Sequence, residues 1–291
     1  MRRRLLPFAL ALSLAGCTGD APQKNVPVEE ELASRFAISA EGAELEEGSR
    51  RLRKGIATFE STFRSPGGDD VTGYVVRSLD PGAAPGGIVV AHGAGGGADD
   101  FLNEAYEYAR RGAVVLTFDS PFVRSDDPKI RNGTAELQET YDTMEQWVED
   151  MLLGLDVLVR QYGVDSGRLG VVGYSMGAQP ATLAAALDPR VAALVVMAGH
   201  AYPSGLPDDL LARRLFTAID TSELVDNLAP ASVLFQGARF DSVVPANELE
   251  VLHERASEPK ELRWYDADHN LGQFAATERV EWLADRLGLD G

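Results

Sequence analysis

The feature that most constrains the fold is an alternation of short apolar runs with longer amphipathic segments from residue 86 onward. The run GGIVVAHG (86–93) is typical of a strand buried on both faces, and five further runs of this kind follow it. Between them lie segments with helical periodicity, the longest over residues 134–161. This alternation predicts an α/β fold in which helices cover both faces of a mostly parallel sheet.

Two more strands are expected ahead of this region. GIATFESTF (55–63) and VTGYVVRSL (71–79) are joined by the turn PGGDD, which predicts an antiparallel pair and brings the sheet to eight strands. Residues 28–54 are rich in charge, and we expect them to be partly helical. With 45% hydrophobic and 25% charged residues, the chain can bury one large core, so we place a single folded domain over residues 55–291.

The first residues indicate export. Arg2, Arg3 and Arg4 precede an apolar stretch, 5–14, that is too short to span a bilayer. The stretch ends in LAGC (14–17), which resembles the lipobox of bacterial lipoproteins. The resemblance implies that residues 1–16 are a signal peptide and that residues 17–54 are a lipidated N-terminus, a tether and a lead-in segment. It also implies an envelope protein, lipid-anchored through Cys17 in the outer membrane; the alternative is an ordinary secretory signal with a stray cysteine.

The charge balance excludes one class of partner. The net charge is −18, and removal of residues 1–16 would take away three arginines and no acid, giving −21. A surface this acidic argues against nucleic-acid binding and against electrostatic attachment to anionic lipid, so the lipid on Cys17 would be the anchor. We find no metal-ligand spacing and no Walker A sequence, and we expect neither metal nor cofactor.

The sequence GYSMG (173–177) matches G-x-S-x-G between a predicted buried strand and an Ala-rich helix. This context predicts a tight turn that exposes the hydroxyl of Ser175 above the sheet, where a nucleophile would lie. Glycines at 173 and 177 would avoid clashes within the turn. The N–H of Met176 is then the first candidate donor to an oxyanion.

A serine nucleophile needs a base, and the chain has four histidines. His269 follows the last predicted strand, where a loop can lean over the sheet, and we assign it as the base. His253 lies within an amphipathic helix and is expected at the surface. His92 precedes a glycine-rich loop, where a structural role is the usual one, and His200 follows the strand after the turn and is a pocket candidate.

The base needs an acid that orients it. Asp241 follows the seventh predicted strand, and the chain order Ser175, Asp241, His269 is that of an α/β-hydrolase. Asp266 and Asp268 are close to His269 in sequence and remain alternatives.

The glycine loop HGAGGGA (92–98) permits two interpretations. It can supply the second oxyanion donor, for which Ala94 is the first choice and Gly95 the second. It also fits the dinucleotide pattern G-x-G-x-x-A, with Asp119 placed as a ribose-binding acid. Two preceding strands, and the lack of any tyrosine followed four residues later by lysine, argue against an NAD(P)-binding oxidoreductase.

From about residue 55 the chain resembles α/β-hydrolases, most of all the dienelactone-hydrolase-like and cutinase-like esterases. The resemblance lies in VVAHGAGGG, GYSMG, QGARFDSVVP and ADHN. It implies a serine hydrolase that cleaves small or polymeric carboxylic esters through an acyl-enzyme. Dienelactone hydrolases use cysteine where this chain has Ser175. The alternatives are a peptidase of the prolyl-oligopeptidase type, without its propeller domain, and a non-catalytic lipoprotein that binds a ligand.

Several residues are candidates for a substrate pocket. Residues 200–231 predict a small cover rather than a large lid. Candidate lining residues are His92, Gly95, His200, Tyr202, Phe122 and Trp264, of which the aromatic residues serve equally well as packing.

Overall fold

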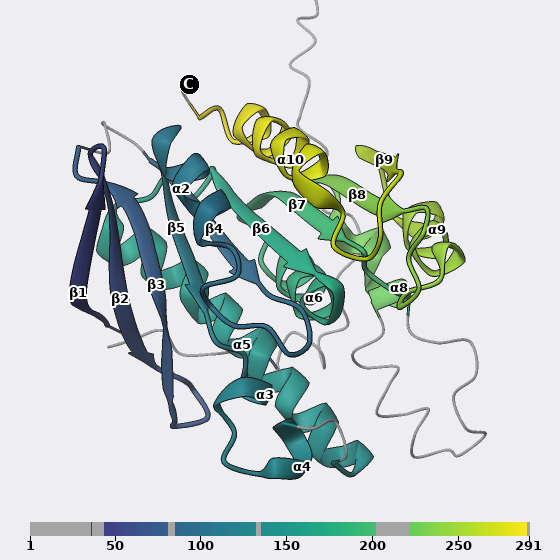
Figure 1. Ribbon diagram of the computed structural model, residues 1–291, viewed down its shortest axis with the longest axis horizontal. Coiled ribbons are helices and arrows are strands. Elements are labelled where there is room, and N and C mark those ends of the chain that lie inside the picture. The colour runs from purple at the N-terminus through teal and green to yellow at the C-terminus, as the bar shows by residue number, and fades with distance from the viewer. Residues whose placement is uncertain (1–35, 37–43, 81–84, 132–134, 202–220, 290–291) are drawn as a thin grey trace, which may run out of the picture.

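The computed structural model describes residue 36 and residues 44–80, 85–131, 135–201 and 221–289 (Figure 1). Within these residues nine strands form one sheet in the order β1-β2-β3-β5-β4-β6-β7-β8-β9. The strands are β1 Leu45–Arg53, β2 Ile56–Arg64, β3 Asp70–Ser78, β4 Gly86–Ala91, β5 Ala113–Phe118, β6 Leu169–Tyr174, β7 Val191–Met197, β8 Ser232–Ala238 and β9 Lys260–Tyr265.

The sheet is antiparallel at one end and parallel across the rest. Strands β1, β2 and β3 pair antiparallel, as do β3 and β5, whereas every pairing from β5 through β4 to β9 is parallel. The predicted antiparallel pair followed by a parallel sheet is therefore confirmed. Because β4 pairs with β6, with Ala91 opposite Gly173, the glycine loop and the G-x-S-x-G turn leave the sheet side by side.

Strand β1 corrects the prediction of eight strands and of a partly helical lead-in. It pairs with β2 from Leu45 opposite Phe63 to Arg53 opposite Ile56. Only Leu45 is buried, and the other side chains of this edge strand are exposed. Backbone hydrogen bonds to β2 hold this strand in the sheet. Because its side chains are exposed, it lacks the apolar alternation by which a half-buried strand is detected.

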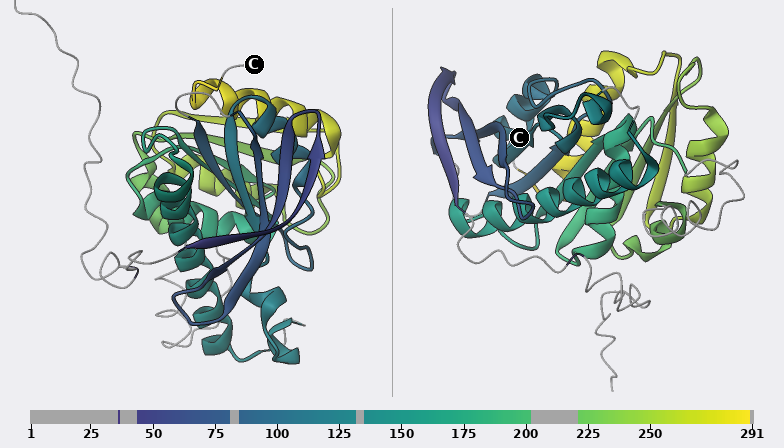
Figure 2. Two further views of the ribbon diagram at one scale, coloured as in Figure 1. Left: turned by 90° about the vertical axis from the view of Figure 1, so that its left-hand side faces the viewer. Right: turned by 90° about the horizontal axis from the view of Figure 1, so that it is seen from below.

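Helices cover both faces of the sheet, as predicted (Figures 1 and 2). One layer contains α5 Leu137–Tyr162, α6 Ala178–Leu187 and α9 Ala246–Arg255, and the other contains α2 Leu102–Arg110 and α10 Gly272–Arg286. The short helices are α3 Pro121–Arg124, α4 Pro128–Arg131, η1 Ser175–Gly177, α8 Thr221–Leu224 and η2 Val225–Leu228.

The core lies in two layers, one on each side of the sheet. In β4, Val89 packs with the α5 and α6 layer, whereas Ile88 and Val90 pack with the α2 and α10 layer. Successive side chains of a strand point to opposite faces, so burial on both faces explains the continuous apolar runs in the sequence.

The long helix α5 is the main support of the α5 and α6 layer. A capping box between Glu136 and Glu139 begins it, and Gly163 in the left-handed region, with φ of 64°, ends it. Gly163 can adopt this conformation without the steric cost of a side chain, and the helix stops there. In the described part of the chain, no helix has the length and apolar character that a membrane span requires.

Candidate active site

The turn after β6 holds Ser175 in a conformation that few non-glycine residues adopt. Its φ is 52°, in the left-handed region, and the residue is buried, with 8% of its surface exposed. A Cβ on Gly173 would lie 2.5 Å from both the Cβ of Ala181 and the carbonyl oxygen of Gly177. A Cβ on Gly177 would lie 2.3 Å from the carbonyl oxygen of His92. Only glycine therefore fits at positions 173 and 177, two residues before and two residues after the serine.

Ser175, His269 and Asp241 form one chain of hydrogen bonds, although they come from loops after three different strands. The Ser175 Oγ lies 2.8 Å from Nε2 of His269. Nδ1 of His269 lies 2.8 Å from Oδ2 of Asp241. The Asp241 carboxylate can only accept, so Nδ1 of His269 carries the proton and Nε2 is free to accept from the serine hydroxyl. The structure thus brings the three predicted residues together in the order that nucleophilic catalysis requires.

Asp241 is held in its charged form by the loop that carries it. Its Oδ1 accepts backbone N–H groups from Val243 at 2.8 Å and Val244 at 2.9 Å. Burial acts to raise the pKa of Asp241, but the hydrogen bonds from His269, Val244 and Val243 outweigh it and lower the pKa below its ordinary value. A carboxylate in this state fixes the histidine ring and can stabilise an imidazolium.

The two alternative acids have other partners. Asp266 forms an exposed ion pair with Arg239 at 3.1 Å. The carboxylate of Asp268 accepts the backbone N–H of Asn270 at 3.0 Å, which closes the turn around His269. Asp241 is therefore the acid that the structure places against His269.

The glycine loop lies against the serine turn. A Cβ on Gly93 would be 3.4 Å from the Cβ of Ser175 and 2.9 Å from the ring of Tyr174. Gly95 has φ of 71°, and the N–H of Gly96 donates to the carbonyl of Gly93 at 3.1 Å, so the loop turns sharply here. Ala94 lies exposed within this turn, and its role as an oxyanion donor stays a prediction.

Known proteins share this architecture. A family profile described as alpha/beta hydrolase fold matches residues 87–217. The chain has the α/β-hydrolase fold. No curated protein sequence matches it.

Solved structures that share this fold include esterases. Acetyl xylan esterase 1 from Thermoanaerobacterium sp. JW/SL YS485 is 17% identical, with a TM-score of 0.70 over 88% of this chain and 93% of the other. A putative dienelactone hydrolase from Klebsiella pneumoniae subsp. pneumoniae MGH 78578 is 17% identical, with a TM-score of 0.61 over 80% and 98%. Porphyromonas gingivalis dipeptidyl peptidase 4 is 15% identical, with a TM-score of 0.60; the match covers 82% of this chain and 36% of the peptidase. The predicted dienelactone-hydrolase-like fold is confirmed, and the likeness to cutinases stays a prediction.

His92 has a structural role in this fold. It is buried against Trp147, with ring centroids 5.4 Å apart. Its Nε2 accepts the backbone N–H of Ser120 at 3.0 Å, so its Nδ1–H donates to the carbonyl of Gly93 at 2.8 Å. Burial lowers the pKa of His92, which keeps the ring neutral as these two bonds require.

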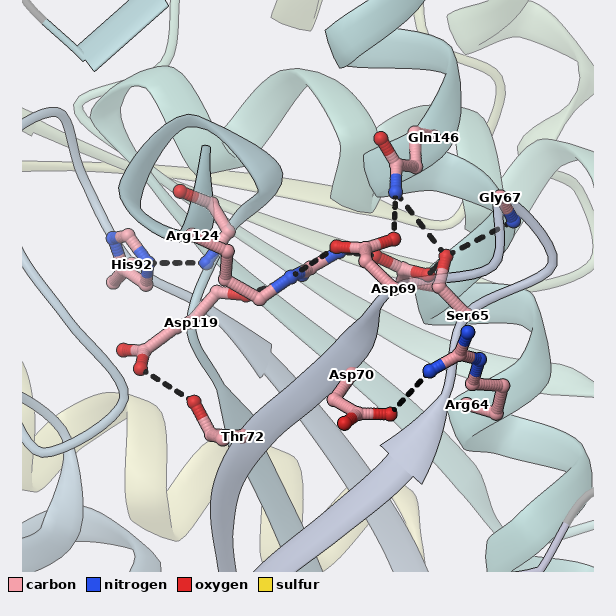
Figure 3. A network of polar contacts seen from close by, with 12 residues as sticks. Arg64, Ser65, Gly67, Asp69, Asp70, Thr72, His92, Asp119, Arg124 and Gln146 are labelled. Carbon is pink, nitrogen blue, oxygen red and sulfur yellow. Dashed lines mark hydrogen bonds and ion pairs between the residues drawn. The ribbon is translucent and has the colours of Figure 1, made fainter. Parts of the chain in front are cut away.

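Asp119, the acid of the dinucleotide pattern, binds the glycine loop itself. Its Oδ1 accepts the backbone N–H of Ala98 at 2.8 Å. Its Oδ2 accepts the hydroxyl of Thr72 at 3.0 Å (Figure 3). The carboxylate that would have to reach a ribose is therefore used to hold the loop.

The other pocket candidates divide between the site and the core. Burial lowers the pKa of His200, and repulsion from His269 adds to this effect when the His269 ring is protonated. Phe122 packs edge-on against Trp147, with ring centroids 6.1 Å apart. Trp264 packs over Gly237, where a Cβ would be 2.3 Å from its ring. Phe122 and Trp264 therefore serve packing, and Tyr202 lies outside the described residues.

Tyr174, which the sequence analysis did not single out, contacts the base directly. Its ring centroid is 5.2 Å from that of His269, and its hydroxyl lies 3.3 Å from both the backbone oxygen of His269 and Oδ1 of Asn270. The sequence signal that could have identified Tyr174 is its place inside the G-x-S-x-G motif.

Within the described residues, no group of three or more His, Cys, Asp or Glu side chains is arranged to hold a metal ion.

Proposed function

We propose that this α/β-hydrolase is a serine hydrolase that cleaves carboxylic esters through an acyl-enzyme on Ser175. The observation that carries the proposal is the unbroken hydrogen-bond chain from the Ser175 hydroxyl through His269 to Asp241, with both distances at 2.8 Å. A hydroxyl becomes a useful nucleophile when a base of this kind can accept its proton.

The proposed cycle moves one proton through His269. Nε2 takes the proton of Ser175 as Oγ attacks the ester carbonyl, and Asp241 stabilises the resulting imidazolium. The imidazolium then gives the proton to the alcohol oxygen as the carbon–oxygen bond breaks. Water loses a proton to His269 and attacks the acyl-enzyme, and Ser175 regains a proton when the acid leaves.

The negative oxygen of each tetrahedral intermediate needs fixed donors. We propose the backbone N–H of Met176 and that of Ala94, with Gly95 as the alternative to Ala94. Both segments flank Ser175, which supports this assignment. One such donor contributes about 3–4 kcal/mol to transition-state stabilisation.

For the substrate, we propose esters of a short acyl group with a polar alcohol. Two polar surface hollows lie beside the glycine loop and the turn that carries His269, and neither has a triad residue in its lining. One is lined by Thr62, Tyr74 and Ala98, and the other by Asp100 and Asn270. An acetyl xylan esterase is among the similar structures, which supports a short acyl group and a polar alcohol. Acetylated carbohydrate is therefore the first substrate to try.

The test is hydrolysis of p-nitrophenyl acetate, butyrate and octanoate, and of an acetylated xylo-oligosaccharide, by the purified protein. We expect acetate to be cleaved fastest, and we expect Ser175→Ala to lose at least ~10³-fold of kcat/KM. The rate that remains in the Ser175→Ala control measures any contribution from contaminating esterases. Equal rates in the two proteins would contradict the proposal.

Two alternatives have distinct outcomes in the same assay. A peptidase, favoured by the likeness to dipeptidyl peptidase 4, would release p-nitroaniline from a chromogenic dipeptide amide in a Ser175-dependent way. A non-catalytic ligand-binding protein would show no Ser175-dependent turnover of either class. Ser175-dependent cleavage of the esters without Ser175-dependent cleavage of the dipeptide amide would support the esterase.

We also propose that the protein is anchored in the cell envelope through lipid on Cys17. The residue lies outside the described part of the chain, and the lipobox-like LAGC sequence supports the proposal. Metabolic labelling with a fatty acid should mark the wild-type protein and leave Cys17→Ser unlabelled. Equal labelling of both would contradict it.

A further inference from the structure

Two consecutive residues after β5 hold both ends of the glycine loop. The backbone N–H of Ser120 donates to Nε2 of His92 at 3.0 Å, at the start of the loop. The carboxylate of Asp119 accepts the backbone N–H of Ala98 at 2.8 Å, at its end. Both His92 and Asp119 are drawn in Figure 3. The loop is thus clamped at two points by one short segment.

That segment is itself tied to β3 and to α3. The backbone N–H of Asp119 donates to the carbonyl of Thr72 in β3 at 2.9 Å, and the Thr72 hydroxyl returns a bond to Oδ2 at 3.0 Å. Arg124 in α3 donates to the carbonyl of Asp119 at 2.6 Å. The Arg124 side chain is 6% exposed and also pairs with Asp150 of α5 at 2.7 Å and with Asp69 at 3.0 Å. Figure 3 shows this network from His92 through Arg124 to Asp69.

The clamped loop lies close enough to Ser175 for its position to affect catalysis. A Cβ on Gly93 would be 3.4 Å from the Cβ of Ser175. A donor must lie about 2.7–3.1 Å from the developing oxyanion, and a misplacement of about 1 Å can cost ~10²-fold in rate.

We propose that Asp119 is a positioning residue that sets the oxyanion donor of the glycine loop. It acts through Ala98, while Ser120 acts through His92 at the other end. Asp119 makes no contact with the triad, so its effect is on geometry. The inference rests on the proposed ester hydrolysis and adds a residue to that same site.

Three variants separate this role from a charge effect. Asp119→Ala removes the acceptor for Ala98, and we expect kcat for p-nitrophenyl acetate to fall ~10- to 100-fold with KM within about twofold. Asp119→Asn keeps an acceptor oxygen while losing the charge, and we expect kcat within about threefold of wild type. Asp126→Ala removes an exposed acid a few residues further on and should have no effect.

Thr72→Val provides a milder variant in case Asp119→Ala folds poorly. It removes one hydroxyl that binds Asp119 and keeps the shape of the side chain. We expect kcat to fall about 2- to 10-fold, the factor expected for one hydrogen bond.

A measurement that does not depend on ester hydrolysis separates the proposed role of Asp119 from the proposed function. Amide hydrogen exchange measured by mass spectrometry should become faster over residues 93–98 in Asp119→Ala and stay unchanged in Asp119→Asn. If the wild-type protein hydrolyses no ester, the proposed function fails, and the exchange comparison still decides the position of the loop. Unchanged exchange in Asp119→Ala, or equal loss of kcat in the Ala and Asn variants, would overturn the inference.

Discussion

At the scale of single residues, Asp241 accepts three hydrogen bonds. One comes from His269 and two come from the backbone of its own loop. Its side chain is 4% exposed, so water has little access to the carboxylate. The loop therefore fixes the carboxylate first, and the carboxylate in turn fixes the tautomer of His269.

This arrangement predicts the effect of Asp241→Asn. An amide can offer its N–H to Nδ1 and favour the wrong tautomer, so kcat should fall ~10³–10⁴-fold with little change in KM. Steady-state kinetics on p-nitrophenyl acetate measure this. Asp266→Asn is the matched control, because Asp266 pairs with exposed Arg239 and should be dispensable. A larger loss in Asp266→Asn would reverse the assignment of the triad acid.

Tyr174 permits a second prediction for a single residue. Its hydroxyl contacts the backbone of His269 and the side chain of Asn270 at 3.3 Å each. Tyr174→Phe keeps the ring against His269 and should lower kcat about 2- to 10-fold, as expected for one weak hydrogen bond. Tyr174→Ala, which removes the ring as well, should lower kcat further. Equal rates in all three proteins would show that this side chain does not support the base.

At the scale of elements, the site depends on the pairing of β4 with β6. The pairing places the carbonyl of His92 directly beside Gly177 and the glycine loop beside Ser175. Two loops that are far apart in the sequence therefore lie together at the carboxyl ends of the parallel strands, which is where ligands bind in open parallel sheets.

The close approach of these two loops makes Gly177→Ala a sharp test. The new Cβ would lie 2.3 Å from the carbonyl oxygen of His92, so the glycine loop must move. We expect a loss of about 1–3 kcal/mol in the free energy of unfolding, measured with urea, together with a fall in kcat. Gly48→Ala is the control, since the nearest atom to its Cβ would be 3.6 Å away. An equal effect of the two substitutions would argue against the close packing.

The elements that could be predicted from sequence are those whose burial leaves a pattern. Strands buried on both faces, such as β4, leave a continuous apolar run, and α5 leaves a stripe of buried side chains. Strand β1 leaves neither, because eight of its nine residues are exposed. The chain order of Ser175, Asp241 and His269 predicted their grouping. The anchors Asp119 and Arg124 could not be predicted, because a hydrogen bond between distant loops has no periodicity.

At the scale of the whole molecule, the buried His92 and the half-buried His200 link stability to pH. Burial lowers the pKa of both His92 and His200 below 6.5. The unfolded chain therefore binds protons on these residues at a pH where the folded protein does not. The stability that they contribute is complete above pH 6.5 and is lost as the pH falls through the lowered pKa values. Asp150 acts in the opposite direction, because burial raises its pKa to about 6.

A variant isolates the histidine contribution from that of Asp150. His92→Gln keeps an acceptor for the N–H of Ser120 and does not titrate. Between about pH 7.5 and pH 5.5, the wild-type protein should lose more free energy of unfolding than His92→Gln does. Urea unfolding at the two pH values measures the difference. Equal losses in both proteins would mean that His92 is not held neutral by the fold.

The most direct test of the central claim is to locate a covalent adduct. A fluorophosphonate reacts with a serine that is activated by a base and mimics the tetrahedral intermediate. We predict one adduct per wild-type molecule, found by peptide mass spectrometry on Ser175, and no adduct in Ser175→Ala or His269→Ala. A wild-type protein that stays unlabelled, or a label on another serine, would contradict the assignment of Ser175, His269 and Asp241 as a catalytic triad.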